Sequence, residues 1–163
     1  MSHAEILSAC ELARVRDQLE ARGEKLVFTN GCFDLLHAGH VRYLQGAREL
    51  GDALVVALNG DESVRALKGE GRPLNGEADR AEVLAALACV NYVIIFPEVR
   101  ATKLLRDVRP HVYVKGGDYT PDTLDPEERG VLENAGTEIR IVPFEAGHST
   151  SALIERMGKL SDA

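Results

Sequence analysis

Apolar and polar positions along the chain follow two alternating patterns. Short runs rich in apolar and β-branched residues predict β-strands at residues 26–28, 53–58, 92–96, 112–114 and 138–143. Longer stretches with helical periodicity predict helices at residues 41–50, 61–67, 78–88, 99–107 and 125–135, and a last helix from about residue 149. Because strands and helices alternate, we predict an α/β fold with three layers, α/β/α, around a parallel sheet of about five strands.

A further helix is predicted ahead of this alternation, at about residues 8–22. Leu12, Val15 and Leu19 share one face of it, and Gly23 follows as a natural stop. The strand and helix alternation then covers about residues 25–160. A chain of 163 residues is long enough for one complete core and too short for two ordinary domains, so we expect a single domain over residues 1–163.

The composition, 45% hydrophobic and 28% charged, is that of a soluble globular protein. A net charge of −7 argues against a surface for nucleic acid or for an anionic membrane, because both require a basic face. No apolar run is long enough to cross a bilayer and no leader-like segment begins the chain, so we expect a cytoplasmic protein. Cys10, Cys32 and Cys89 are widely spaced, which predicts free thiols and no structural zinc.

The loop between the first predicted strand and its helix carries the strongest chemical signal. Gly31 relaxes the backbone where the strand ends, and Gly39, between His37 and His40, lets the chain turn into the helix. A helix N-terminus presents unpaired N–H groups and a partial positive charge, which suits phosphate. Two imidazoles at such a turn are therefore predicted to face one anion.

Three later segments add candidate phosphate contacts. The glycine-rich stretch 68–76 carries Lys68 and Arg72, which we interpret as a lid that brings both cations to phosphate oxygens. Residues 115–118 follow a predicted strand directly, and ligands of parallel sheets lie at the carboxyl ends of strands. Residues 149–151 supply three hydroxyls at the start of the last helix, more than a single N-cap needs.

The segment His37-Ala38-Gly39-His40 resembles the His-x-Gly-His signature of the cytidylyltransferase-like nucleotidyltransferase superfamily. That resemblance implies a Rossmann-like fold that binds a nucleoside triphosphate and transfers a nucleotidyl group. From about residue 26 to residue 157 the motifs look like those of the adenylyltransferase domain of ADP-heptose synthases. The segment Val114-Lys115-Gly116-Gly117-Asp118-Tyr119 is the most discriminating.

The resemblance to ADP-heptose synthases implies a reaction of ATP with D-glycero-β-D-manno-heptose 1-phosphate that yields ADP-heptose and pyrophosphate. It also implies a transferase without the kinase half of the bifunctional enzymes. Two places depart from the family pattern. His148 stands where cysteine or isoleucine is common, and residues 125–128 follow no family motif.

Site roles follow from the motifs and the resemblance. Catalytic roles at the triphosphate and the acceptor phosphate are assigned to His37, His40, Lys68 and Lys115. Binding roles are assigned to Asn30, Gly31, Phe33, Asp34, Gly39, Asn59, Arg72, Arg80, Gly116, Gly117, Asp118, Ser149, Thr150 and Ser151. Asp34 and Lys115 are expected to line the acceptor side or its boundary with the nucleotide, and Arg80 could reach a phosphate. Mg²⁺ is expected to arrive with ATP, because the sequence shows no carboxylate cluster for a dedicated metal site.

Other functions remain open or are disfavoured. Hydride transfer and P-loop kinase activity are disfavoured, because neither Gly-x-Gly-x-x-Gly nor Gly-x-x-x-x-Gly-Lys-Ser/Thr occurs. The alternatives are transfer from CTP or ATP to another phosphorylated acceptor, such as glycerol 3-phosphate or FMN, and a catalytically silent nucleotide-binding regulator. Intact His37, His40 and Lys115 argue against the silent regulator. Exposed apolar positions on the early helices would permit a homodimer.

Overall fold

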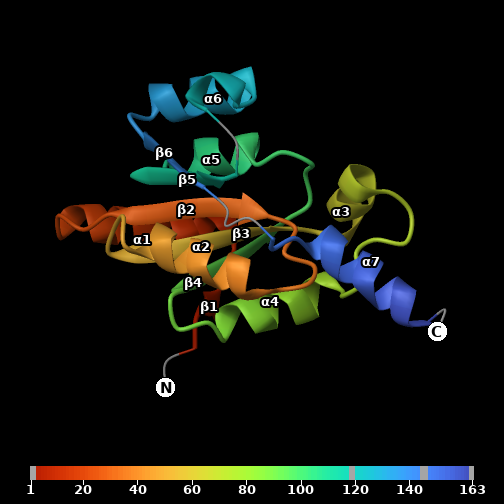
Figure 1. Ribbon diagram of the computed structural model, residues 1–163. Helices are drawn as coiled ribbons and strands as arrows, with labels where there is room; N and C mark the ends of the chain where they lie inside the picture. Colours follow the sequence, from red (N-terminus) through yellow and green to blue (C-terminus); the bar gives the residue numbers. More distant parts are fainter. Residues whose placement is uncertain (1–2, 118–119, 144–146, 162–163) are drawn as a thin grey trace.

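The computed structural model describes residues 3–117, 120–143 and 147–161, and a six-stranded parallel sheet forms its middle layer (Figure 1). The strands are β1 (Glu5–Ile6), β2 (Leu26–Gly31), β3 (Ala53–Asn59), β4 (Tyr92–Phe96), β5 (Val112–Gly116) and β6 (Glu138–Val142). Their order across the sheet is β1-β4-β3-β2-β5-β6, with every neighbouring pair parallel. The predicted α/β fold with a parallel sheet is confirmed.

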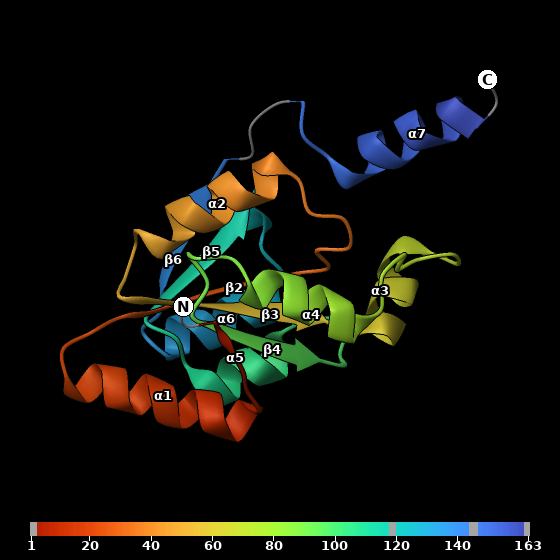
Figure 2. The same cartoon turned by 90° about the horizontal axis from the view of Figure 1, so that it is seen from below.

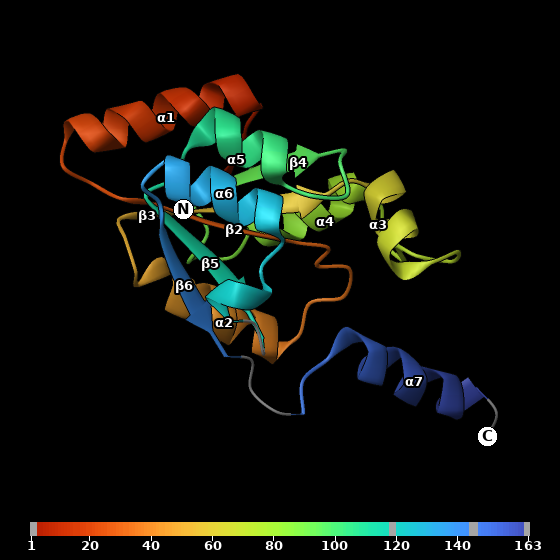
Figure 3. The ribbon, with the colours of Figure 1, turned by 90° about the horizontal axis from the view of Figure 1, so that it is seen from above.

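Helices cover both faces of this sheet, as Figures 2 and 3 show from below and from above. They are α1 (Ala9–Ala21), α2 (Ala38–Arg48), α3 (Asp61–Lys68), α4 (Glu77–Ala85), α5 (Thr102–Val108), α6 (Pro126–Asn134) and α7 (Thr150–Ser161), with a short 3₁₀ turn at Pro121–Thr123. Buried residues of α1, α5 and α6 pack on one face of the sheet, and those of α2 and α4 pack on the other.

Side chains that alternate between the two faces of the sheet explain why there are two hydrophobic cores, one on each face. In β2, Leu26 and Phe28 point to the side of α1 and α5, whereas Val27 points to the side of α2 and α4. All three side chains are fully buried. A strand that is apolar on both faces is stable only between two helical layers, so the sequence pattern and the three-layer architecture agree.

The direction of strand order reverses between β2 and β5, and this is the feature that creates a site. From β2 the chain adds β3 and then β4 on one side, and it later returns to place β5 and β6 on the other side. The register pairs Thr29 with Val114, so Asn30 and Lys115 come next along two adjacent strands. At such a reversal the loops diverge and leave a crevice beyond the carboxyl ends of the strands.

The sequence pattern missed the edge strand β1. Its two residues, Glu5 and Ile6, pair with Tyr92 and Val93 of β4, and both are exposed. Two exposed residues carry no periodicity that a pattern can detect, which explains why the prediction began with residue 26. The described residues form six strands, where about five were expected.

Helix α7 runs away from the body of the molecule in Figures 1 and 2. Its side chains Met157 and Leu160 are 59% and 78% exposed. Its first turn lies beside the loop that follows β2, where the Thr150 hydroxyl donates to the carbonyl of Leu35 at 3.1 Å. None of the helices in the described ranges combines the length and the apolar character that crossing a bilayer requires.

The Tyr43 side chain connects α2 to β2 and β5, the two strands between which the strand order reverses. A substitution tests this contact. The Tyr43 hydroxyl lies 2.7 Å from the Thr29 hydroxyl and donates to the Val114 carbonyl at 3.2 Å. Tyr43→Phe removes these bonds inside the core, so we expect the free energy of unfolding in urea to fall by about 1–2 kcal/mol. Tyr92→Phe is the matched control, because the Tyr92 hydroxyl bonds to none of the described residues. Equal losses in both variants would contradict this role.

Candidate active site

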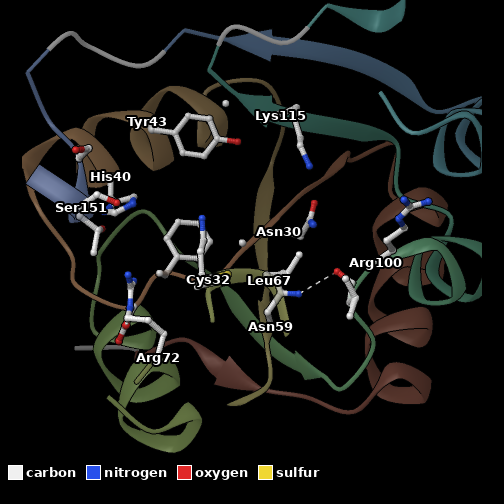
Figure 4. A pocket seen from close by; sticks show the side chains of 18 of the residues that line it. Asn30, Cys32, His40, Tyr43, Asn59, Leu67, Arg72, Arg100, Lys115 and Ser151 are labelled. Atoms are coloured by element: carbon white, nitrogen blue, oxygen red, sulfur yellow. Dashed lines mark hydrogen bonds and ion pairs between the residues drawn. The ribbon is translucent and has the colours of Figure 1, made fainter. Parts of the chain in front are cut away.

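A cavity of about 720 Å³ opens at the carboxyl edge of the sheet, where the strand order reverses (Figure 4). Most of the predicted site residues line it, namely Asn30, Gly31, Phe33, Asp34, His37, His40, Asn59, Lys68, Arg72, Lys115, Gly116, Ser149, Thr150 and Ser151. Gly39, Arg80 and Gly117 lie outside this lining, and Asp118 lies outside the described residues. The topology therefore gathers segments that are far apart in the sequence around one space.

His37 and His40 form a stacked pair at the start of α2. Their ring centroids are 3.9 Å apart with an interplanar angle of 26°, and the Phe33 ring lies 5.4 Å from His40. Nδ1 of each imidazole is buried without a hydrogen-bond partner among the described residues. Buried polar atoms are normally paired, so both imidazoles have hydrogen-bonding capacity that the described residues do not use.

Two glycines permit this arrangement. A Cβ on Gly39 would lie 2.7 Å from Cβ of His148 and 3.0 Å from the His37 ring, so a side chain there would push the histidines apart. A Cβ on Gly31 would lie 2.9 Å from the Phe33 ring. Phe33 itself has a φ of 44°, in the left-handed region that non-glycine residues rarely adopt. The loop is thus folded tightly around the histidine pair.

Burial favours the neutral form of both imidazoles. It lowers the pKa of His40 to about 4, with a smaller contribution from His37. Burial also lowers the pKa of His37, and His148, whose ring centroid is 6.0 Å away, lowers it further. A neutral imidazole still donates one hydrogen bond, and a bound polyanion would stabilise its protonated form. The pair is therefore suited to respond to phosphate.

Asp34 organises the loop that follows α3. Its buried carboxylate accepts hydrogen bonds from Nε of Arg72 at 2.7 Å and from the amides of Leu74 and Asn75 at 2.8–2.9 Å. Burial alone would raise the pKa of Asp34, but these hydrogen bonds outweigh burial and the pKa is lowered. The Asp34 carboxylate thus fixes Arg72 and the 72–75 segment, and its predicted place on the acceptor side, or at its boundary with the nucleotide, stays a prediction.

Arg80 makes several contacts within the protein, and its predicted contact with a phosphate stays a prediction. Its guanidinium is buried beneath the cavity and donates to the carbonyls of Asn75, Cys32 and Asn59 at 2.6–2.9 Å. It also pairs with Asp61 at 2.8 Å. Four of its five donors are thus used within the protein. Arg80 joins three segments of the cavity wall from behind.

The three hydroxyls before and within α7 have different roles. The Ser149 hydroxyl accepts from the amide of Ala152 at 3.0 Å, which is an N-cap contact. The Thr150 hydroxyl is bonded to the loop after β2, as described above. Ser151 lines the cavity next to His40 in Figure 4. The expectation that capping explains one of the three hydroxyls agrees with these contacts.

The cytidylyltransferase-like family model matches residues 28–156, a region that includes the histidine pair, Lys115 and the hydroxyl segment. The chain belongs to the cytidylyltransferase-like family. The predicted membership of this nucleotidyltransferase family is confirmed.

Curated relatives of this cytidylyltransferase-like chain carry the name bifunctional protein HldE. The chain is 51% identical over 156 residues to HldE of Pelobacter propionicus, which covers 96% of this chain and 32% of that protein. It is 46% identical over 157 residues to HldE of Pasteurella multocida, covering 96% of this chain and 33% of that protein. The chain therefore spans about a third of the length of these relatives.

Two solved structures resemble the fold. The lipopolysaccharide core biosynthesis protein from Thermoplasma volcanium matches with a TM-score of 0.62 and 29% identity, over 76% of this chain and 98% of that chain. Pantoate-beta-alanine ligase from Francisella tularensis, complexed with beta-gamma ATP and beta-alanine, matches with a TM-score of 0.59, over 98% of this chain and 78% of that chain. At 15% identity the second likeness concerns the fold alone.

Several lining residues of this cytidylyltransferase-like site were not predicted from the sequence. They are Cys32, Tyr43, Leu67, Val99, Arg100, Leu124, Asp125, Glu128 and His148. Arg100 follows β4 and Asp125 follows β5, so the rule that strand ends gather at one edge was the signal available for them. Burial raises the pKa of the Cys32 thiol, which disfavours the thiolate that a nucleophile requires. All three cysteines are free.

Carboxylates, imidazoles and thiols do not gather into a metal site in the part of the chain that the structure describes. No group of three His, Cys, Asp or Glu side chains is close enough there to hold an ion. Lys68 at the end of α3 and Lys115 at the end of β5 line the cavity with Arg72. In a protein with a net charge of −7, these cations provide local positive charge for phosphate.

The lowered pKa of His40 predicts a pH dependence of stability. Between pH 6.5, the ordinary value, and about 4, the folded value, the unfolded chain takes up a proton that the folded chain does not. The free energy of unfolding should therefore fall as the pH falls through this window. The His40 ring is partly exposed, so we expect its contribution to this fall in the free energy of unfolding to be on the order of 1 kcal/mol after solvent screening.

Urea titrations of the wild type and of His40→Gln at several pH values measure that share. His37 and His111 also have lowered pKa values, so the difference between the two proteins isolates His40. The variant should lose less stability than the wild type between pH 6.5 and about 4. Parallel profiles in the two proteins would show that His40 is not held neutral by the fold.

Proposed function

We propose that this nucleotidyltransferase transfers AMP from ATP to D-glycero-β-D-manno-heptose 1-phosphate, giving ADP-heptose and pyrophosphate. The observation that carries the proposal is the imidazole pair at the start of α2, in one cavity with Lys115 from the adjacent strand. The relatives named HldE support the heptose as acceptor. So does the name of the Thermoplasma volcanium protein, which refers to the lipopolysaccharide core.

The proposed reaction is a direct displacement at phosphorus. An ionised oxygen of the sugar phosphate attacks the α-phosphorus of ATP, and the bond from the α-phosphorus to the oxygen that bridges it to the β-phosphorus breaks. That bridging oxygen leaves with the pyrophosphate and keeps the electron pair of the broken bond. Such a reaction needs positioning and charge neutralisation more than covalent chemistry by the protein.

We assign roles in this displacement to the histidine pair, the cations and the start of α7. His37 and His40 donate hydrogen bonds to oxygens of the α-phosphate and of the departing pyrophosphate. Lys68 and Arg72 neutralise the outer phosphates, and Ser151 with the amides at the start of α7 binds their oxygens. Lys115, on the neighbouring strand end, binds the phosphate of the acceptor.

Mg²⁺ enters this account as part of the nucleotide substrate. Magnesium prefers carboxylate, phosphate and water oxygens. No group of three His, Cys, Asp or Glu side chains among the described residues is placed to hold a metal ion by itself. The described residues therefore fit a metal that is held by the triphosphate oxygens and water, where it would neutralise phosphate charge.

A pyrophosphate-release assay tests the reaction. ATP and CTP are each combined with heptose 1-phosphate, glycerol 3-phosphate and FMN, and release is expected with ATP and heptose 1-phosphate. Release with CTP and glycerol 3-phosphate alone would replace the proposed substrates. Nucleotide binding without release in every combination would favour a silent regulator.

His37→Ala tests the role of the imidazole pair. Loss of one donor to the reacting phosphates should lower kcat by about 10²- to 10³-fold, while ATP still raises Tm. His3→Ala is the control, because His3 is exposed and lies outside the cavity lining. Full activity of His37→Ala would contradict the mechanism.

A further inference from the structure

The cavity has a second wall that the proposed mechanism does not use. It consists of Arg100 in the segment after β4, and of Asp125 and Glu128 at the start of α6, with Val99 and Leu124 between them. We refer to these five residues as the far wall. In Figure 4, Arg100 lies on the side of the cavity opposite His40 and Ser151, and Lys115 projects into the space between.

Hydrogen bonds within the protein hold the far wall in place. Asp125 pairs with Arg100 and accepts from the amides of Glu127 and Glu128 at 3.0 and 3.2 Å. Glu128 is only 5% exposed, and its carboxylate accepts from the amide of Ala101 at 3.1 Å. The carboxylates of Asp125 and Glu128 are therefore held by the protein itself, which lowers the entropic cost of recognition.

Asn59 supports the same segment from the end of β3. Its buried side-chain amide donates to the Ser63 hydroxyl at 2.7 Å and lies within 3.5 Å of the carbonyls of Glu98 and Val99. Figure 4 shows this contact as a dashed line between Asn59 and the neighbouring segment. Asn59 was predicted to bind the nucleotide directly, and these contacts also give it a part in positioning the far wall.

The mixture of charges indicates what the far wall binds. Two carboxylates would repel a triphosphate, so this is the less favourable end of the cavity for the nucleotide phosphates. Carboxylates accept hydrogen bonds from hydroxyl groups and a guanidinium donates to them, while Val99 and Leu124 offer apolar contact for C–H groups. This combination suits a neutral skeleton that carries several hydroxyls.

In-line geometry places such a skeleton at the far wall. The attacking phosphate must lie opposite the departing pyrophosphate, with the α-phosphorus between them. If the histidine pair and α7 hold the triphosphate, the acceptor phosphate lies toward Lys115, and its carbon skeleton extends beyond. We propose that the far wall binds the hydroxyls of the sugar phosphate and that Arg100 and Asp125 determine acceptor specificity. This inference rests on the proposed function.

Calorimetric binding in the presence of a non-hydrolysable ATP analogue tests the far wall without turnover. The probes are D-glycero-β-D-manno-heptose 1-phosphate and inorganic phosphate. Arg100→Gln and Asp125→Ser remove the charges, and serine retains an N-cap for α6. Both variants should bind the heptose 1-phosphate about tenfold or more weakly, because hydrogen bonds to charged groups are lost. Binding of inorganic phosphate and of the ATP analogue should be unchanged.

Arg106→Gln is the matched control. Arg106 on α5 also pairs with an α6 carboxylate, Glu127, at 3.7 Å, but neither residue lines the cavity. Unchanged heptose 1-phosphate binding in Arg100→Gln and Asp125→Ser would overturn the inference. So would weaker binding of the ATP analogue alone, or no sugar phosphate binding to the wild type. Equal Tm values across the variants confirm that all of them are folded.

Binding and turnover measurements together distinguish a failure of the proposed function from a failure of the inference about the far wall. If the wild type binds heptose 1-phosphate through Arg100 and Asp125 but releases no pyrophosphate, the transfer reaction is contradicted and the far wall is supported. If the wild type turns over and both variants retain the wild-type KM for the acceptor, the far wall alone is contradicted.

Discussion

The parallel pairing of β2 with β5 is the constraint on which the site depends. Because the strand order reverses there, the loops after these two strands diverge and leave a crevice between them. The register that pairs Thr29 with Val114 places the histidine loop beside Lys115, although the two are far apart in the chain. Tyr43 then ties α2 to both strands, so that the imidazoles keep a fixed position relative to the lysine.

The charged and polar side chains around this crevice are distributed in a way that suits a polyanion. The protein is acidic overall, yet cations from α3, the following loop and β5 line the same cavity as the stacked histidines. Arg80 and Asp34 form hydrogen bonds with other residues of the protein and stabilise the cavity wall. Burial lowers the pKa of both imidazoles, and a bound polyanion would stabilise their protonated form.

The sequence was most informative where structure is local. Apolar runs located the long strands, and the two histidines around Gly39 located the loop at the centre of the site, because strand, turn and helix start are adjacent in the chain. The roles of Arg80 and Asp34 were not accessible in this way, since only the tertiary fold reveals which carbonyls and amides surround a charge. Arg100 and Asp125 carry no local motif and meet only because the sheet brings strand ends together.

A crystal structure with a non-hydrolysable ATP analogue tests directly whether the histidine pair holds the triphosphate. We expect oxygens of the α-phosphate to lie within hydrogen-bonding distance of His37 or His40, and the outer phosphates to point toward Ser151 and Lys68. A triphosphate bound against Arg100 and Asp125, away from the imidazole pair, would contradict it.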